Sequence, residues 1–453
     1  MNIKYGKLTT KKGGANRRVG VVSLGCAKNL INTEQMMYLL GEAGFDITSD
    51  MEGVDIALVN TCGFIDSAVS EAIETIIGLG EMKESGLIGK IVVSGCLPER
   101  YKNEIMIELP EVDAVAGTGS FDEIVCVIDE LSGTDEKVTR FGDINSPVSE
   151  TGRYISTSPA WAYLKIAEGC DNCCAYCVIP SIRGRFRSRP VENIVAEARS
   201  LVGRGIRELI VIAQDVTMYG KDIYGKRKLT DLLTELNAIE ELKWIRLHYL
   251  YPDDIDDNFI DLIAEYDKII KYLDIPIQHI NDAILARMNR RSSGESIRAL
   301  FRRLRERIPG VVIRTSIIAG LPGEGEEEFE ELCQFLTEAK LERAGIFPYS
   351  AQEGSAAALM DRPDSGIAVE RAGLLADLQS RIMDNYDKSR IGSEVTVLIE
   401  GSNGSGSFFG RSFAESPDVD GYIIVKGSGI LVNEFTEVRI TAASEGVLTG
   451  EKI

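Results

Sequence analysis

A short cysteine-rich loop, Gly169 to Cys177, constrains this chain more than any other stretch. Cys170, Cys174 and Cys177 have the spacing C-x3-C-x2-C. Three thiolates on so short a loop can turn to one side and hold three irons of a cubane cluster, because soft thiolate ligands suit iron–sulfur chemistry. The fourth iron then has no protein ligand and is free to bind a small molecule. The spacing therefore favours an iron–sulfur site with chemistry of its own.

Two alternatives exist for this loop. A zinc site is disfavoured, because no fourth Cys or His lies nearby in the sequence to complete a tetrahedron. A different triplet, made of Cys170, Cys173 and Cys177, has the spacing C-x2-C-x3-C. Spacing alone does not choose between the two triplets.

The overall composition indicates a multidomain cytoplasmic protein. A length of 453 residues suggests about three domains. We find no apolar run long enough to cross a membrane, and the amino terminus lacks the apolar core of a signal peptide. The nine cysteines are odd in number and clustered, which fits metal sites in a reducing cytoplasm better than disulfides. The net charge of −20 predicts repulsion of nucleic acid and attraction of basic partners.

Residues 1–132 are expected to form an α/β domain with a parallel sheet. Strands that alternate with helical patterns are predicted at residues 19–24, 54–59, 90–94 and 112–116. Cys26, Cys62 and Cys96 each follow one of these strands beside a glycine. Because the carboxyl ends of parallel strands meet at one edge, we expect the three thiols to meet as a metal site. Three separate core cysteines are the alternative, and Cys126 is expected to be such a core residue.

Residues 133–158 are predicted to be a linker with at most a short strand at 137–139. Residues 159–388 then show six βα units, too few for a closed eight-fold barrel, so we predict an open partial TIM barrel. The cysteine loop follows its first strand. Gln214 and Arg314 lie at or near the ends of other strands, where barrel enzymes bind cofactors, while His248 is expected to be a core residue. An arginine-rich loop, 183–189, either binds an anion or pairs with nearby acids.

The C-x3-C-x2-C loop at the start of a six-unit βα chain resembles the radical S-adenosylmethionine (SAM) superfamily. The resemblance implies that Cys170, Cys174 and Cys177 carry a 4Fe-4S cluster, which selects this triplet over the one with Cys173. It also implies that SAM chelates the open iron and is cleaved to a 5′-deoxyadenosyl radical. We predict Gln214 and Arg314 as SAM-binding residues. The sequence does not assign a catalytic role to any side chain.

The three cysteines on the preceding α/β domain narrow the resemblance to the methylthiotransferases. This family resemblance covers nearly the whole chain. It implies a second 4Fe-4S cluster on Cys26, Cys62 and Cys96, whose open iron holds the sulfur to be inserted. The protein is therefore expected to be a transferase that inserts sulfur and transfers a methyl group from a second SAM. An electron donor such as flavodoxin or ferredoxin is implied as a partner.

Residues 389–453 show short alternating strands separated by Gly and Ser turns, as in a small five-stranded, oligonucleotide-binding-like barrel. In position and pattern the segment resembles the TRAM module that ends this family. Many TRAM modules bind RNA, but residues 391–453 contain four basic and nine acidic side chains. Phosphate binding requires a surplus of Lys and Arg. Nucleic acid is therefore an unlikely primary substrate.

Two branches of the family differ in substrate. One modifies adenosine in tRNA, and the other adds methylthio to the β-carbon of an aspartate in ribosomal protein S12, a strongly basic protein. Four segments resemble the second branch: Ala27-Lys28-Asn29, residues 60–68, residues 95–100 and residues 214–220. The acidic net charge favours the same branch. We therefore predict a ribosomal protein S12 aspartate methylthiotransferase, with a tRNA adenosine methylthiotransferase as the alternative.

Overall fold

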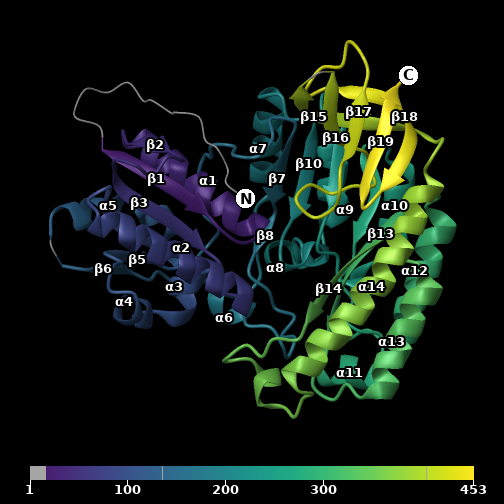
Figure 1. Ribbon diagram of the computed structural model, residues 1–453, viewed down its shortest axis with the longest axis horizontal. Helices are drawn as coiled ribbons and strands as arrows, with labels where there is room; N and C mark the ends of the chain where they lie inside the picture. The colour runs from purple at the N-terminus through teal and green to yellow at the C-terminus, as the bar shows by residue number, and fades with distance from the viewer. Residues whose placement is uncertain (1–16, 135, 405) are drawn as a thin grey trace.

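The computed structural model describes residues 17–134, 136–404 and 406–453. Figure 1 shows an amino-terminal α/β part, a central partial barrel and a small carboxyl-terminal β-barrel that sits on the central part. The fold class predicted from the sequence is thus confirmed. Within the described residues, none of the helices is both long and apolar enough to cross a membrane.

The amino-terminal part is a three-layer α/β structure. All its strands run parallel, in the order β2-β1-β3-β4-β5-β6. The strands are β1 (Arg18–Ser23), β2 (Asp46–Thr48), β3 (Val54–Thr61), β4 (Ile88–Gly95), β5 (Ala114–Ala116) and β6 (Val138–Arg140). The helices are α1 (Ala27–Glu42), α2 (Asp66–Glu84), α3 (Cys96–Tyr101), α4 (Glu104–Glu108), η1 (Thr118–Glu123) and α5 (Ile124–Ser132). Apolar residues of α1 and α5 cover one face of the sheet, and those of α2, α3 and α4 cover the other.

One short strand of this part confirms a sequence-based expectation, and one cysteine contradicts another. The short strand predicted near residue 137 is β6, which pairs with β5 and extends the sheet into the expected linker. Cys126 is exposed, so its assignment to the core was wrong. The buried stripe of α5 is formed by Ile124, Val127, Ile128 and Leu131. This i, i+3, i+4, i+7 spacing fills the core face and leaves position 126 on the outside.

The central part is an open sheet of six parallel strands in the order β14-β13-β12-β11-β10-β7. These are β7 (Trp161–Lys165), β10 (Glu208–Ile212), β11 (Trp244–Leu247), β12 (Ile269–Asp274), β13 (Val312–Ala319) and β14 (Arg343–Pro348), and a two-stranded sheet, β8 (Ala167–Glu168) with β9 (Arg187–Ser188), accompanies them. The helices are α6 (Ile179–Arg183), α7 (Val191–Gly203), η2 (Val216–Met218), α8 (Lys221–Tyr224), α9 (Leu229–Asn237), η3 (Pro252–Asp254), α10 (Asp257–Glu265), α11 (Asp282–Arg287), α12 (Gly294–Arg307), α13 (Glu326–Ala339), η4 (Ala356–Leu359) and α14 (Ser365–Ser389).

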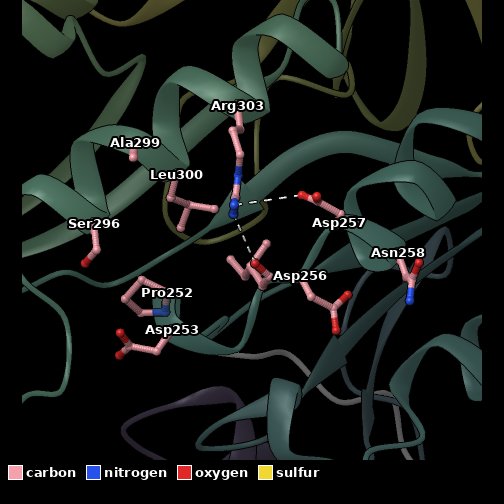
Figure 2. Close-up of a pocket in the computed structure, with 10 residues that line it drawn as sticks. Pro252, Asp253, Asp256, Asp257, Asn258, Ser296, Ala299, Leu300 and Arg303 are labelled. Carbon is pink, nitrogen blue, oxygen red and sulfur yellow. Dashed lines mark hydrogen bonds and ion pairs between the residues drawn. The ribbon is translucent and has the colours of Figure 1, made fainter.

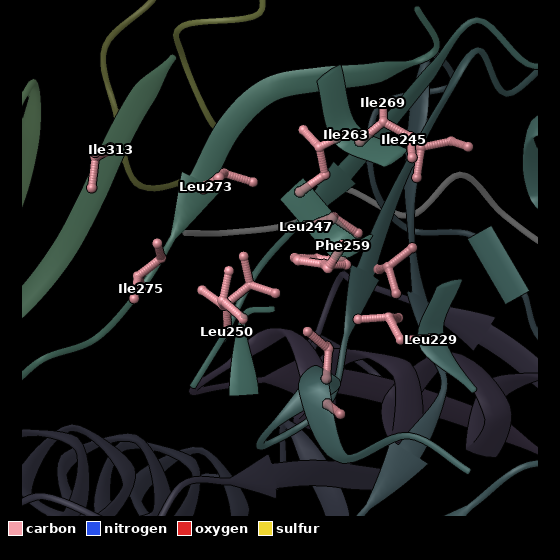
Figure 3. Close-up of a cluster of buried hydrophobic side chains, with 14 of the residues drawn as sticks. Leu229, Ile245, Leu247, Leu250, Phe259, Ile263, Ile269, Leu273, Ile275 and Ile313 are labelled. Carbon is pink, nitrogen blue, oxygen red and sulfur yellow. The ribbon is translucent and has the colours of Figure 1, made fainter. Parts of the chain in front are cut away.

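Aliphatic side chains fill the space between the outer face of this sheet and the helices. Figure 3 shows part of this core, in which Leu247 and Leu273 from the strands lie near Phe259 and Ile263 from α10. All four are at most 4% exposed. The inner face of the sheet carries buried polar residues, among them Lys165, Arg246 and Asp274, beside smaller apolar clusters that pack against the carboxyl-terminal barrel.

The carboxyl-terminal part is a closed barrel with the strand order β15-β16-β17-β19-β18. The strands are β15 (Glu394–Gly404), β16 (Ser407–Arg411), β17 (Ile423–Lys426), β18 (Phe435–Ser444) and β19 (Val447–Lys452). The segment between β16 and β17 reaches into the central sheet. Tyr272 donates to Asp420 at 2.7 Å, and the Ser416 hydroxyl pairs with the His248 ring at 2.9 Å. Buried polar contacts therefore hold the small barrel in one position on the central part.

His248 should make the stability of this junction sensitive to acid. Burial lowers the pKa of His248 to about 3. Below pH ~6.5 the unfolded chain binds a proton that the folded chain does not, so stability falls as pH drops toward 3, by about 1.4 kcal/mol per pH unit. We expect His248→Gln to remove this contribution and flatten the pH dependence of the unfolding free energy between pH 6.5 and 4. Parallel curves for the two proteins would contradict a buried neutral imidazole.

Candidate active site

The loop with Cys170, Cys174 and Cys177 begins directly after β8 and is tied to three parts of the central domain. The Cys170 amide donates to the Gly184 carbonyl at 3.2 Å, and the Ala175 amide donates to the Met288 carbonyl at 3.0 Å. The Asn172 side chain donates to Asp215 at 2.7 Å. Asp215 follows β10, so the loop is fixed to the carboxyl-terminal edge of the sheet, as predicted.

The structure brings Cys170, Cys174 and Cys177 together. The pKa of Cys170 is raised to about 11 and that of Cys177 to about 12. Burial is the main cause of both shifts, and the neighbouring Cys174 contributes to both values. Such thiols lose their protons when a metal takes the proton's place. An Arg290 nitrogen lies 4.0 Å from the Cys174 sulfur and can offset negative charge there. Cys173, in contrast, is exposed and has a φ of 46°.

Cys26, Cys62 and Cys96 lie at the carboxyl ends of β1, β3 and β4, where the sequence placed them. They approach closely because glycines separate them: a Cβ on Gly25 would lie 2.6 Å from the Cys62 Cβ, and one on Gly63 would lie 2.9 Å from the Cys96 carbonyl. Burial, then the charges of Cys96 and Cys26, raise the pKa of Cys62 to about 12. The three thiols thus share one location at the sheet edge.

Arg183 connects the two groups of cysteines. It belongs to α6, which follows Cys177, yet its side chain crosses to the amino-terminal part and donates to Asn29 at 3.2 Å. It also donates to Glu168, two residues before Cys170, at 2.9 Å. The positive charge of Arg183 acts to lower the pKa values of Cys96 and Cys26. The charges of these two thiolates in turn raise the pKa of Arg183. The two cysteine sites therefore face one domain junction.

The arginine-rich loop mostly serves the protein's own carboxylates. Arg183 pairs with Glu168, and Arg189 pairs with Glu150 and Glu197. Arg187 donates to backbone carbonyls of the same loop. Of the two interpretations left open by the sequence, pairing with local acids describes Arg183 and Arg189, while backbone carbonyls hold Arg187.

Of the two predicted SAM-binding residues, Gln214 lies just beyond the carboxyl end of a strand and Arg314 lies near the beginning of one. Gln214 follows β10 and donates to Glu168 at 3.2 Å, while its Oε1 atom is buried and has no hydrogen-bond partner among the described residues. Arg314 lies in β13 and donates to Asp274 at 2.7 Å. Sequence reasoning missed Glu168 and Arg290, because the only signal for them is the set of distant partners that folding supplies. It named Lys28 only as part of a segment that resembles one branch.

The cavity shown in Figure 2 belongs to another region. It measures about 660 Å³ and lies between α12 and the start of α10, where Arg303 approaches Asp257 at 3.8 Å. None of its lining residues is a cysteine or a predicted site residue. Among the described residues no three Cys, His, Asp or Glu side chains are arranged to hold a single metal ion.

Comparison with known families divides the chain in the same way. Residues 18–117 match the "Uncharacterized protein family UPF0004", residues 164–336 match the "Radical SAM superfamily" and residues 391–453 match the "TRAM domain". The fold resembles a radical SAM methyltransferase, TsrM, from Kitasatospora setae, with a TM-score of 0.55 and 16% identity, over 74% of this chain and 77% of that one. These findings define a radical SAM protein with an additional amino-terminal α/β domain and a TRAM domain.

Full-length relatives identify the family within this class. The chain is 46% identical to the ribosomal protein uS12 methylthiotransferase RimO of Geobacter sulfurreducens, over 97% of this chain and 99% of that protein. It is 43% identical to the protein of the same name from Acetivibrio thermocellus, over 96% and 98%. The chain belongs to the uS12 methylthiotransferase family, which confirms the branch predicted from the sequence.

Proposed function

We propose that this protein is a radical SAM transferase that adds a methylthio group to the β-carbon of an aspartate in ribosomal protein uS12. The observation that carries the proposal is the pair of three-cysteine sites that face one junction, linked through Arg183. Relatives similar over the full length bear this activity in their names. A two-cluster electron carrier is distinguished by its products, because it would release no 5′-deoxyadenosine when reduced in the presence of SAM.

The residues present fit the cofactors that this reaction requires. Cys170, Cys174 and Cys177 would hold one 4Fe-4S cluster, and the amino-terminal triplet would hold a second. Each set offers three thiols, so one iron of each cluster stays open. The unpartnered Oε1 atom of Gln214 suits a donor such as the amino group of SAM, and Arg314 would contact the same cofactor.

When bound, these cofactors supply a radical that removes hydrogen from an unactivated C–H bond, together with the sulfur and the methyl group. The protein's own residues provide position and charge. Glu168 accepts hydrogen bonds from Arg183, Lys165 and Gln214. Arg183 lies at the domain junction, Lys165 on the inner face of the sheet, and Gln214 is a predicted SAM-binding residue. One carboxylate thus holds these three side chains in place. The guanidinium of Arg290 offsets negative charge beside Cys174.

The acidic chain suits a basic substrate protein. A net charge of −20 accelerates encounter with a positively charged partner such as a ribosomal protein. The reducing electron would come from a small carrier of the flavodoxin or ferredoxin type.

Anaerobically reconstituted protein, incubated with SAM, sulfide, dithionite and purified uS12, should produce uS12 with one added methylthio group at an aspartate. Peptide mass spectrometry checks this result. Total tRNA serves as the competing substrate in a parallel reaction. A methylthioadenosine product in tRNA with unchanged uS12 would transfer the assignment to the other branch.

A further inference from the structure

Lys28 is a buried cation that lacks a counter-ion. The residue is 6% exposed, its ammonium nitrogen keeps some contact with solvent, and no hydrogen bond or ion pair joins that nitrogen to any described residue. Its contact is with an aromatic ring: the ammonium lies 3.1 Å from the centre of the Tyr249 ring. A buried charge is strongly destabilising unless it is paired, and one cation–π contact compensates only part of that penalty. The position of Lys28 therefore calls for an anion that binds from outside.

Helix stability does not explain this lysine either. Lys28 is the second residue of α1, and the first turn of that helix contains no acidic residue. A cation at a helix amino terminus opposes the helix dipole. Three other buried or partly buried cations near these sites have carboxylates: Arg183 and Lys165 pair with Glu168, and Arg314 pairs with Asp274. Arg290 has none among the described residues, but it donates to the Pro276 carbonyl at 2.6 Å.

Lys28 lies between the two reaction partners. On one side it is two residues from Cys26, and its charge helps to lower the pKa of that thiol against the effect of burial. On the other side, the Tyr249 amide donates to Asp274 at 3.2 Å, and Asp274 accepts from Arg314. A short chain of contacts thus runs from the amino-terminal cysteine site through Lys28 and Tyr249 to a predicted SAM-binding residue.

Tyr249 holds a strained conformation at this place. Its φ of 61° lies in the left-handed region, which is unfavourable for a bulky side chain. Its carbonyl accepts from the Val216 amide at 3.1 Å, so bonds on both sides of the residue fix the strain. Strain of this kind concentrates at binding sites, where it directs a side chain toward a ligand. Here it directs the ring to the ammonium of Lys28.

We propose that Lys28 binds the carboxylate of the substrate aspartate and makes the enzyme specific for an acidic side chain. The proposal rests on the proposed function. In aspartate the reacting β-carbon is bonded directly to the carboxylate carbon, so a group that holds the carboxylate also holds the reacting carbon. The ammonium lies between the sulfur-donating site and the SAM side, where that carbon has to be.

The test uses Lys28→Met, Lys28→Arg and a control, Lys268→Met, in the reconstituted full chain. Lys268 is a partly buried lysine that donates to the Ile239 carbonyl. It directly precedes β12, whereas Asp274, which accepts from the Tyr249 amide, ends that strand. Substrates are uS12 and a uS12 variant in which the modified aspartate, located by mass spectrometry, is replaced by asparagine. Lys28→Met should raise the KM for uS12 about tenfold or more and abolish the preference for aspartate over asparagine. Lys28→Arg should retain the preference, and Lys268→Met should behave as the wild type.

Iron content and substrate-free release of 5′-deoxyadenosine are measured in parallel, and KM is compared between wild-type and Lys28→Met preparations of equal iron content. If the variant loses iron or this basal cleavage while keeping its preference for aspartate, Lys28 balances cluster charge and the proposal is overturned. An unchanged KM and preference overturn it too, although uS12 modification by the wild type would then still support the proposed function. If the wild type leaves uS12 unmodified, both proposals fail.

Discussion

Cys174→Ala abolishes the release of 5′-deoxyadenosine from SAM in the reconstituted protein, whereas Cys62→Ala retains it and yields no methylthiolated uS12. This is the expected result because the two thiols belong to different sites. Cys174 is charge-coupled to Cys170 and Cys177 on the loop beside Gln214. Cys62 is coupled to Cys96 and Cys26 on the amino-terminal sheet. Each variant should contain about four irons per chain and the wild type about eight.

Cys173→Ala is the matched control for the first variant. It changes a thiol on the same loop, but one that is exposed and held at a positive φ, with its carbonyl bonded to Asn289. It should cleave SAM at the wild-type rate, as measured by chromatography of the nucleoside products. Loss of cleavage in Cys173→Ala together with full cleavage in Cys174→Ala would assign the cluster to the alternative triplet.

Sequence patterns could predict where the cysteines lie because parallel sheets place strand ends at one edge. Cys26, Cys62 and Cys96 are far apart in the sequence, but each follows a buried strand, and this topological position decides that they meet. The same reasoning placed the loop after the first strand of the partial barrel. These predictions depend on backbone direction alone, which alternation of strands and helices determines well.

Side-chain partners could not be predicted in this way. Arg183 belongs to an arginine-rich loop whose pattern suits an external anion and a local acid equally. The burial of Glu168 beside it, and the approach of Asn29 from another domain, follow from tertiary packing alone. Lys28 is similar: the sequence marks it as part of a segment that resembles one branch, but only the fold brings Tyr249 to it. Strand β6 shows the same division: its existence was predicted at 137–139, but its pairing with β5 in the amino-terminal sheet was not.

Glu208→Gln should destabilise the junction between the central part and the TRAM barrel by about 3–5 kcal/mol. Glu208 is completely buried and accepts from Arg246 and from Arg411 of the TRAM barrel, each at 2.7 Å. The neutral amide would leave the buried guanidinium of Arg246 without a counter-ion and that of Arg411 with Glu400 alone. Trp161 and Trp244, the only tryptophans of the chain, both contact TRAM residues, so their fluorescence during urea denaturation reports on this junction.

Glu434→Gln provides the control at the same junction. Glu434 approaches Arg207 at 4.0 Å, but its side chain is 55% exposed, and exposed ion pairs contribute at most about 1 kcal/mol. The fluorescence transition of Glu434→Gln should nearly overlay that of the wild type. The midpoint of the Glu208→Gln transition should move to a lower urea concentration. Equal shifts for the two variants would mean that apolar contacts, such as Trp244 on Phe435, hold the barrel in place and that the buried ions add little. In that case Glu208→Leu, which removes the charge and adds apolar contact, should bind the barrel as firmly as the wild type.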